Sequence, residues 1–285
     1  MVDFPVVDSH IHLLEPARFG YAWTKGAPSL NRRVLPSDLT RAAAPFVVDR
    51  FVFVEVDVDF PQHLAEADWV AEQAAADSRL QGMVAALPME RGKAVEPDLD
   101  KLRRHKVLRG IRRLIQNQAD PEFCVRPDFI AALKLLPRHD LSFDICVLHP
   151  QMPKVIEMVR QCPEVRFVLD HIGKPAIKAG IRDPWREHMK ALASHRNVFC
   201  KISGVANEAD HAGWTREQLK PYIAHAIECF GFERSMYGGD WHVMELAIAY
   251  PEWVSLVDWV VEGTTAAEKQ KLFRDTAIHF YRLDR

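Results

Sequence analysis

The chain lacks a strong excess of charge of either sign and lacks any long apolar run. Its 37 Lys and Arg residues are balanced by 39 Asp and Glu residues, for a formal net charge of -2. This balance offers no basic field for nucleic acid or for an anionic membrane surface. No uninterrupted apolar segment is long enough to span a bilayer, and the first residues do not read as a signal peptide. We therefore expect a small-molecule partner, with no nucleic acid and no membrane.

Cysteine is scarce, and its pattern excludes a disulfide framework. The five cysteines are odd in number and widely spaced, and none forms the Cys-x-x-Cys pair of a zinc ribbon. Most of them lie in apolar stretches, which predicts reduced thiols in the core and a reducing, cytoplasmic location. They are Cys124, Cys146, Cys162, Cys200 and Cys229.

Short apolar or β-branched segments recur along the chain, with helical periodicity between most of them. The strand candidates are residues 5–14, 50–58, 80–88, 107–115, 141–149, 165–171, 198–205 and 235–241. The helical stretches include residues 62–76, 127–136, 152–161, 184–194 and 216–230. This alternation predicts a parallel sheet of the α/β class. Eight repeats in 285 residues favour a closed (β/α)8 TIM barrel, with an open doubly wound sheet as the alternative.

No Gly-rich or Ser-rich linker and no low-complexity tract divides the chain. We therefore expect one domain over residues 1–285, with a helix over residues 265–281 closing the barrel exterior. The connection over residues 15–40 is long and irregular, which is typical of a lid or wall over a site.

The segment Val6-Val7-Asp8-Ser9-His10-Ile11-His12 closes an apolar run with two histidines spaced by one residue. On a strand, this spacing turns both imidazoles to one face. If the strand is the first of a barrel, the pair lies at the end where barrel active sites are built. We expect His10 and His12 to hold a divalent metal such as zinc, with His149 and Asp240 completing the shell. Two hydrogen-bonded core histidines are the alternative.

Other strand candidates also end in polar residues, and a barrel would bring these to one pocket. They are Glu55 and Asp57, Arg112, His149, Asp170 and His171, Lys201 and Ser203, and Asp240. Asp240 follows two glycines, so its carboxylate is a candidate to deprotonate water, although capping of the next helix is the alternative. Adjacent residues point to opposite faces, so we expect His171 in the site and Asp170 behind the strand.

Substrate binding is assigned to a second group of side chains. Arg112 is a better pocket candidate than Arg113 and would fork to substrate oxygens, with an ion pair to Glu55 or Asp57 as the alternative. Glu55 is a candidate for binding sugar hydroxyls. Lys174 would bind a substrate oxygen from a loop or would simply be solvated. Trp241 would stack on a ring, with Trp23 and Asn207 as weaker candidates.

In combination and order, these motifs resemble the amidohydrolase-2 branch of the amidohydrolase superfamily, which includes L-fuconolactonase-type sugar lactonases. The resemblance spans essentially the whole chain. It rests on Asp8-Ser9-His10-Ile11-His12, Gly110-Ile111-Arg112, Leu148-His149-Pro150, Val168 to Pro175, Lys201-Ile202-Ser203-Gly204 and Gly238-Gly239-Asp240-Trp241. It implies a (β/α)8 barrel with His10, His12, His149, His171 and Asp240 at the site.

One departure bears on the metal. Binuclear members of the superfamily end strand four in a carbamylated lysine that bridges two metals, whereas this chain has Arg112 there. The resemblance therefore implies at most one metal, which some members of the branch do without.

The leading functional hypothesis is hydrolysis of a sugar-derived lactone, in which Asp240 activates water and His171 or Asp240 returns a proton to the leaving oxygen. A zinc-dependent decarboxylase or hydratase of an aromatic or unsaturated acid is the first alternative. A catalytically silent barrel that binds a small ligand is the second. No pattern in the sequence indicates which lactone is the substrate, the size of its ring or the oligomeric state of the protein.

Overall fold

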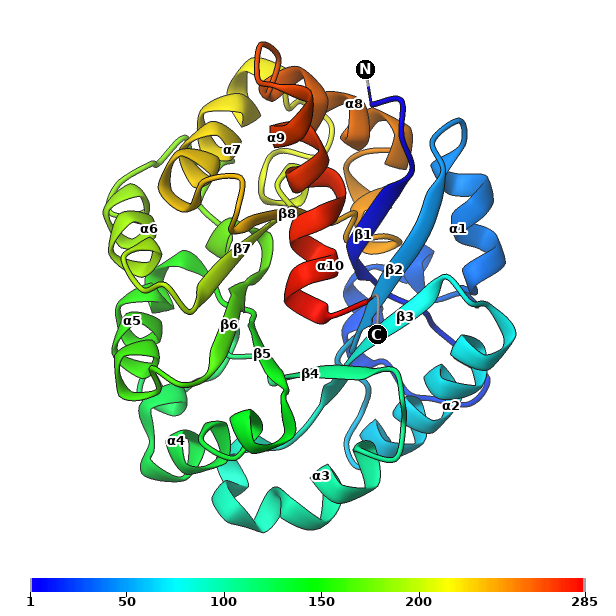
Figure 1. The fold of residues 1–285 in the computed structure, drawn as a ribbon, viewed down its shortest axis with the longest axis vertical. Coiled ribbons are helices and arrows are strands. Elements are labelled where there is room, and N and C mark those ends of the chain that lie inside the picture. Colours follow the sequence, from blue (N-terminus) through cyan, green and yellow to red (C-terminus); the bar gives the residue numbers. More distant parts are fainter. Residues whose placement is uncertain (1, 284–285) are drawn as a thin grey trace.

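A computed structural model describes residues 2–283 as eight parallel strands arranged in sequence order around a barrel (Figure 1). The strands are β1 (Val6–Ile11), β2 (Val48–Val54), β3 (Leu80–Ala86), β4 (Leu108–Arg112), β5 (Ser142–Ile145), β6 (Arg166–Leu169), β7 (Val198–Ile202) and β8 (Ser235–Tyr237). An isolated parallel bridge between Ile11 and Trp241 joins β1 to the segment that follows β8. The predicted TIM barrel is confirmed.

Helices α1 to α8 lie around the outside of the barrel, and two further helices, α9 and α10, follow them at the C-terminal end of the described chain (Figure 1). They are α1 (Pro36–Ala43), α2 (His63–Ala76), α3 (Glu96–Leu102), α4 (Pro127–Leu133), α5 (Met152–Gln161), α6 (Trp185–Ala193), α7 (Arg216–Phe230), α8 (Tyr250–Val260), α9 (Ala266–Gln270) and α10 (Thr276–Tyr281). Proline occupies the first turn of α1, α3, α4, α5 and α8, where its missing N–H costs no hydrogen bond. Among residues 2–283, no helix is both long and apolar enough to cross a bilayer.

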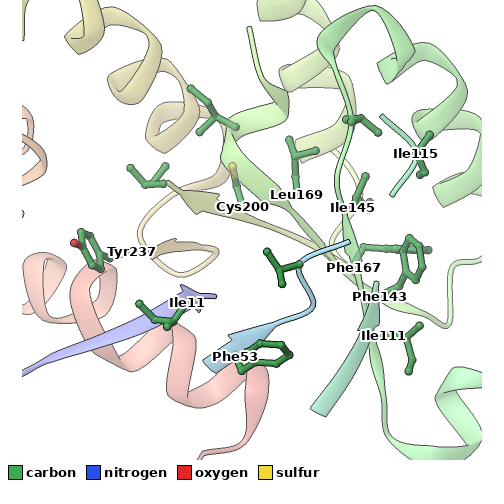
Figure 2. Close-up of a cluster of buried hydrophobic side chains, with 14 of the residues drawn as sticks. Ile11, Phe53, Ile111, Ile115, Phe143, Ile145, Phe167, Leu169, Cys200 and Tyr237 are labelled. Atoms are coloured by element: carbon green, nitrogen blue, oxygen red, sulfur yellow. The ribbon is translucent and has the colours of Figure 1, made fainter. Parts of the chain in front are cut away.

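The apolar core has two parts, one on each side of the strands. The larger part fills the space between strands and helices, and Figure 2 shows side chains such as Phe53, Phe143 and Phe167 in it. The smaller part combines Val7, Val52, Val54, Val84, Val168 and Met236 of the strands with Ala277, Phe280 and Tyr281 of α10. Burial of both faces explains why the strands are continuous apolar runs rather than alternating ones.

The C-terminal segment differs from the single exterior helix expected over residues 265–281. It is divided into α9, a π-helical turn (Lys271–Asp275) and α10. In Figure 1, α10 crosses the middle of the barrel, and Phe280 and Tyr281 join the smaller core. The expectation of an exterior helix was wrong for α10, because Phe280 and Tyr281 are buried against the strand residues of the smaller core.

The irregular connection over residues 15–40 is fixed to the barrel by hydrogen bonds. Trp23 Nε1 donates to the carbonyl oxygen of Val56 at 2.7 Å, and the backbone amide of Ala22 donates to Asp59 Oδ1 at 3.0 Å. Trp23 of this connection also lines the cavity described below.

Candidate active site

A cavity opens at the carboxyl ends of the strands, where parallel barrels build their sites. Its volume is about 170 Å³, and it is lined by His12, Trp23, Val56, Asp57, Arg112, Leu114, Gln116, Asn117, Cys146, His171, Lys174, Asp240 and Val243. Five of these residues, Asp57, Asn117, His171, Lys174 and Asp240, have positive φ angles between 46° and 62°. Backbone strain of this kind in non-glycine residues concentrates at functional sites.

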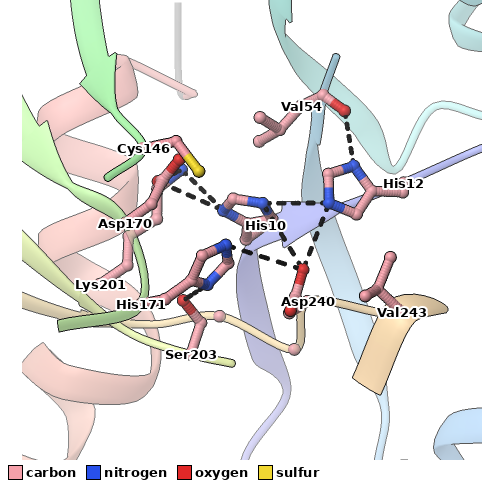
Figure 3. A network of polar contacts seen from close by, with 12 residues as sticks. His10, His12, Val54, Cys146, Asp170, His171, Lys201, Ser203, Asp240 and Val243 are labelled. Atoms are coloured by element: carbon pink, nitrogen blue, oxygen red, sulfur yellow. Dashed lines mark hydrogen bonds and ion pairs between the residues drawn. The ribbon is translucent and has the colours of Figure 1, made fainter. Parts of the chain in front are cut away.

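Three side chains converge at the floor of the cavity (Figure 3). His10 Nε2 lies 3.2 Å from His12 Nε2, and Asp240 Oδ1 lies 3.2 Å from His12 Nε2 and 3.8 Å from His10 Nε2. His12 Nδ1 donates a hydrogen bond to the carbonyl oxygen of Val54 at 2.8 Å. This bond turns the Nε2 lone pair of His12 toward His10 and Asp240.

His171 completes the floor from the other side. Its Nε2 lies 3.9 Å from Asp240 Oδ1, and its Nδ1 lies 2.9 Å from the hydroxyl of Ser203. Gly204 allows this approach, because a Cβ at Gly204 would lie 2.6 Å from His171 Nδ1. As expected, His171 faces the cavity.

Burial and neighbouring charge set the protonation of the floor. Burial lowers the pKa of His171 to about 4, and it lowers the pKa of His10 well below its usual value. Burial alone would raise the pKa of Asp240, but His171 and the hydrogen bond with His12 outweigh burial and lower it. At neutral pH the floor therefore combines an ionised carboxylate with neutral His10 and His171 imidazoles, which can act as ligands or proton carriers.

The donor set fits one divalent cation. His10, His12 and Asp240 each direct one ligand atom to a common region, and their mutual distances of 3.2 to 3.8 Å suit atoms that share an ion. The three ligand atoms are hydrogen-bond acceptors in close contact, with too few protons between them to form hydrogen bonds to one another. A cation bound among them would relieve the repulsion between their lone pairs. Two imidazole nitrogens and a carboxylate oxygen match the preference of zinc.

Arg112 lies beside this group, so Arg112 rather than Arg113 faces the cavity. Its Nε donates to Glu55 Oε1 at 2.6 Å, and its Nη1 donates to Asp170 Oδ2 at 3.1 Å. Arg113 points to the helical layer, where it forms two bonds with Glu90 at 2.7 and 2.9 Å. The ion pair with Glu55 that the sequence left open is therefore present, and Arg112 also lines the cavity.

Glu55 does not line the cavity, in contrast to the expectation that it binds sugar hydroxyls. It is 2% exposed, and its Oε2 accepts the backbone amide of Asp57 at 2.8 Å. Both carboxylate oxygens are thus engaged by the protein itself.

The expectation that Asp170 lies behind the strand was wrong. Asp170 is buried on the same side as His10, with its Oδ2 3.1 Å from Arg112 Nη1 and its Oδ1 3.4 Å from His10 Nδ1. Strand alternation does not apply because β6 ends at Leu169 and residues Asp170–Gly173 form a turn in which His171 has a φ of 53°.

Lys174 reaches the cavity from the loop that follows β6. Its ammonium donates to Gln116 Oε1 at 2.7 Å, and no Lys174 ion pair is present among residues 2–283. Gln116 and Asn117 add amide groups to the wall, and Asp57 adds a carboxyl whose pKa is raised by burial and by Glu55. Trp23 supplies an indole surface. These groups are suited to hydroxyl and carbonyl oxygens on a small ring.

Two expected site residues lie elsewhere. His149 begins the short 3-10 turn His149–Gln151, outside both the cavity lining and the His/Asp groups, because β5 ends at Ile145 and the chain turns away. Trp241 is 1% exposed, and its indole donates to Glu245 Oε1 at 2.8 Å rather than facing the cavity. The weaker candidate Asn207 donates to the carbonyl oxygen of Val243 at 3.1 Å.

Four residues of the site and its support were not singled out from the sequence. Gln116 and Asn117 follow the fourth strand in a loop, and only their position after a strand end could have indicated them. Asp144 lies inside β5 and Tyr281 in α10, where the hydroxyl of Tyr281 donates to Asp144 Oδ2 at 2.6 Å. A lone Asp within an apolar strand was the available signal, since an isolated buried charge requires a partner.

Comparison with known proteins identifies relatives along nearly the whole chain. A family model described as Amidohydrolase matches residues 7–283. Two proteins named L-fucono-1,5-lactonase, from Burkholderia ambifaria and Burkholderia multivorans, are each 30% identical to the chain and cover 98% and 97% of it, with 96% of each relative covered. An amidohydrolase from Burkholderia multivorans crystallised with bound zinc is 28% identical, with a TM-score of 0.87 over 98% of this chain and 99% of that one.

Proposed function

This chain belongs to the amidohydrolase family, and on that premise we propose that it hydrolyses a sugar-derived lactone of the L-fuconolactone type to the open sugar acid. The observation that carries the proposal is the carboxylate of Asp240 among the imidazoles of His12 and His171 at the floor of a polar cavity. The names of the two relatives at 30% identity support the same reaction class.

We assign Asp240 as the base that activates water. Its lowered pKa keeps it ionised near neutral pH, so it can accept a proton from a water molecule in the cavity. The water oxygen then bonds to the lactone carbonyl carbon, and the carbonyl oxygen takes up negative charge. The Arg112 guanidinium at the cavity wall is placed to stabilise that charge.

Collapse of the tetrahedral intermediate breaks the bond between the carbonyl carbon and the ring oxygen. The ring oxygen needs a proton, which protonated Asp240 returns directly or through His171, 3.9 Å away. The hydrogen bond with Ser203 holds the His171 ring in the required orientation. The products are a hydroxyl group and a carboxylic acid, which ionises in water.

The cavity wall would hold the sugar ring. Lys174 and Gln116 form one hydrogen-bonding pair for ring substituents, and Trp23 offers an apolar surface to the face of a ring. Leu114 and Val243 line the same cavity and exclude water from part of it.

We propose that His10, His12 and Asp240 hold at most one divalent metal ion, on the basis of their mutual distances. When bound there, such an ion supplies Lewis acidity to the lactone carbonyl. His149 is not included in this set, because it lies outside the His/Asp groups.

Residues 1–285 are proposed to form one domain, since a single barrel accounts for the described chain. The cytoplasmic location expected from the thiols stays a prediction, although all five cysteines are free and Cys229 alone is only partly buried.

The test is a pH-indicator hydrolysis assay over five- and six-membered sugar lactones and pyrone-type lactones. It is run on the purified protein, after chelator treatment, and after zinc is added back. Turnover of a sugar lactone supports the proposal, and its loss and recovery with zinc would assign the metal a catalytic part. Absence of turnover on every lactone, with carbon dioxide release from an aromatic acid, would replace it with a decarboxylase function.

A further inference from the structure

The cavity wall carries hydrogen-bonding groups that the protein itself does not engage. Among residues 2–283, no hydrogen bond or ion pair involves the Asp57 carboxylate, and none involves the Nε2 amide of Gln116. In the same part of the chain, the Lys174 ammonium donates to Gln116 alone, at 2.7 Å. All three side chains line the cavity, so these groups are free to bind a ligand there.

The orientation of the Gln116 amide is fixed by its neighbours. An ammonium can only donate a hydrogen bond, so the Gln116 atom that lies 2.7 Å from Lys174 Nζ must be the oxygen. The Cys146 thiol donates to the same oxygen at 3.5 Å. The two N–H groups of the amide therefore remain for a ligand, as do the remaining N–H groups of Lys174. On this side, the wall offers hydrogen-bond donors.

Asp57 is a group of the opposite kind, because a carboxylate only accepts hydrogen bonds. Its backbone is left-handed, with a φ of 53°, and its amide donates to Glu55 Oε2 at 2.8 Å. Glu55 is in turn held by Arg112 Nε at 2.6 Å. A buried ion pair thus fixes the backbone of Asp57 in a conformation that costs energy, while its own side chain is exposed and lines the cavity. Such strain is typical of residues that contact a ligand.

The acceptor and the donors come from different sides of the barrel. Asp57 follows β2 and Lys174 follows β6, and these strands lie on opposite sides of the eight-stranded barrel (Figure 1). Gln116 follows β4 and is bonded to Lys174. One unpaired carboxylate and one unpaired ammonium therefore face the cavity from opposite sides, and their charges balance. A ligand without net charge fits this wall better than an anion.

We propose that Asp57 is a specificity-determining residue, which selects uncharged, hydroxylated lactones by accepting a hydrogen bond from a ring hydroxyl. That the ligand is a lactone rests on the proposed function. Other oxygens of the same ring accept hydrogen bonds from Gln116 and Lys174. A lactone without hydroxyls leaves the Asp57 carboxylate without a donor, and a carboxylated lactone brings a second negative charge toward it.

The first test compares two six-membered lactones, a sugar lactone and δ-valerolactone, which lacks hydroxyls. Asp57→Asn removes the charge, and Asp57→Gly removes the whole side chain. Both new residues tolerate a positive φ, so the backbone is kept. In each variant, kcat/KM for the sugar lactone should fall about 10- to 100-fold, the value of a hydrogen bond to a charged group, and kcat/KM for δ-valerolactone should stay nearly unchanged.

Asp140→Asn is the matched control. Asp140 is also an exposed aspartate with a left-handed backbone, at a φ of 57°, but it precedes β5 at the end of the barrel opposite the cavity. Its carboxylate pairs with Arg166 and Arg282, each at 3.0 Å. This variant should leave both kcat/KM values unchanged. Equal losses on the two lactones in Asp57→Asn, or no loss on either, overturn the proposal.

A second test uses a carboxylated ring. A pyrone dicarboxylate is added as a competitor during hydrolysis of the sugar lactone, and its inhibition constant is measured for the wild type and Asp57→Asn. Loss of the like charge should make the competitor bind about 5-fold more tightly to the variant. Equal or weaker inhibition of Asp57→Asn contradicts the proposed charge selection.

Binding of a lactam separates this proposal from the proposed reaction. In a six-membered sugar lactam, an N–H replaces the ring oxygen, so calorimetric titration needs no hydrolysis. The wild type should bind the sugar lactam, and Asp57→Asn and Asp57→Gly should bind it about 10-fold more weakly. A wild type that binds the lactam but opens no lactone overturns the proposed reaction and leaves the role of Asp57 supported. No binding by the wild type, or equal binding by the wild type and both variants, overturns the role of Asp57.

Discussion

Asp240 Oδ1 and His12 Nε2 lie 3.2 Å apart, although their residues come from opposite ends of the chain. The backbone amide of Asp240 also donates to the carbonyl oxygen of His10 at 2.8 Å, so the contact that closes the barrel also assembles the site. If this carboxylate is the base, Asp240→Asn should lower kcat by about 10²- to 10⁴-fold, the usual contribution of a general base.

The measurement is steady-state lactone hydrolysis, with circular dichroism to confirm the fold. Asp258→Asn is a suitable comparison because Asp258 contacts Lys269 on the outer helices, away from the cavity. A folded Asp240→Asn variant with wild-type turnover would remove Asp240 from the mechanism.

Gly204 permits the close approach of His171, and its substitution should damage the site. A Cβ at Gly204 would lie 2.6 Å from His171 Nδ1 and 3.1 Å from Asp240 Oδ2. Gly180 has a similar positive φ, 67° against 62°, but nothing within 4 Å of its added Cβ. Gly204→Ala should therefore lose activity well beyond Gly180→Ala, while both pay a backbone cost of about 1 kcal/mol.

The comparison combines kcat with the free energy of unfolding in urea. Equal activity in the two alanine variants would mean that His171 need not hold its observed position.

Lys174 should contribute to substrate binding rather than to the chemical step. Its ammonium lines the cavity and donates to Gln116 Oε1 at 2.7 Å. Lys174→Met should raise KM about 10-fold, which corresponds to about 1.4 kcal/mol of lost hydrogen bonding. Lys178→Met removes a neighbouring exposed lysine that pairs with Asp210 at 3.5 Å, and it should leave KM unchanged. If the Lys174→Met and Lys178→Met variants have the same KM, Lys174 does not contribute to substrate binding.

Asp8 should make stability depend on pH. It is fully buried, and burial raises its pKa from 3.8 to about 7, against the opposing hydrogen bonds from Gly239 and Tyr250. The folded pKa lies above the unfolded value, so its stabilising contribution is complete below about pH 4 and is lost as pH rises toward 7. At about 1.4 kcal/mol per pH unit, the loss is on the order of 4 kcal/mol.

Urea unfolding of the wild type and Asp8→Asn between pH 4 and pH 8 tests this. The wild type should lose stability relative to the variant as pH rises, because Asn does not ionise. Parallel curves for the two proteins would show that Asp8 has an ordinary pKa.

Much of the fold could be predicted because the spacing of apolar residues along the chain differs between strands and helices. Eight apolar segments separated by helical stretches indicate a parallel barrel, and every predicted strand overlaps an observed one. Strand ends were less predictable: the fifth candidate ran to residue 149, whereas β5 ends at Ile145. His149 instead begins a short turn, His149–Gln151, that contains a proline and lies outside the cavity. Hydrophobic periodicity does not reveal such a turn.

The sequence by itself determined which residue types gather at the site: two histidines spaced by one residue, a carboxylate after two glycines, and a third histidine after the sixth strand. Only the tertiary structure decided how they are supported. Glu55 serves Arg112 rather than substrate, and Tyr281 reaches Asp144 across 137 residues of chain. Pairings of this kind depend on which buried charges the closed barrel brings within a few ångströms, and no local sequence pattern specifies that distance.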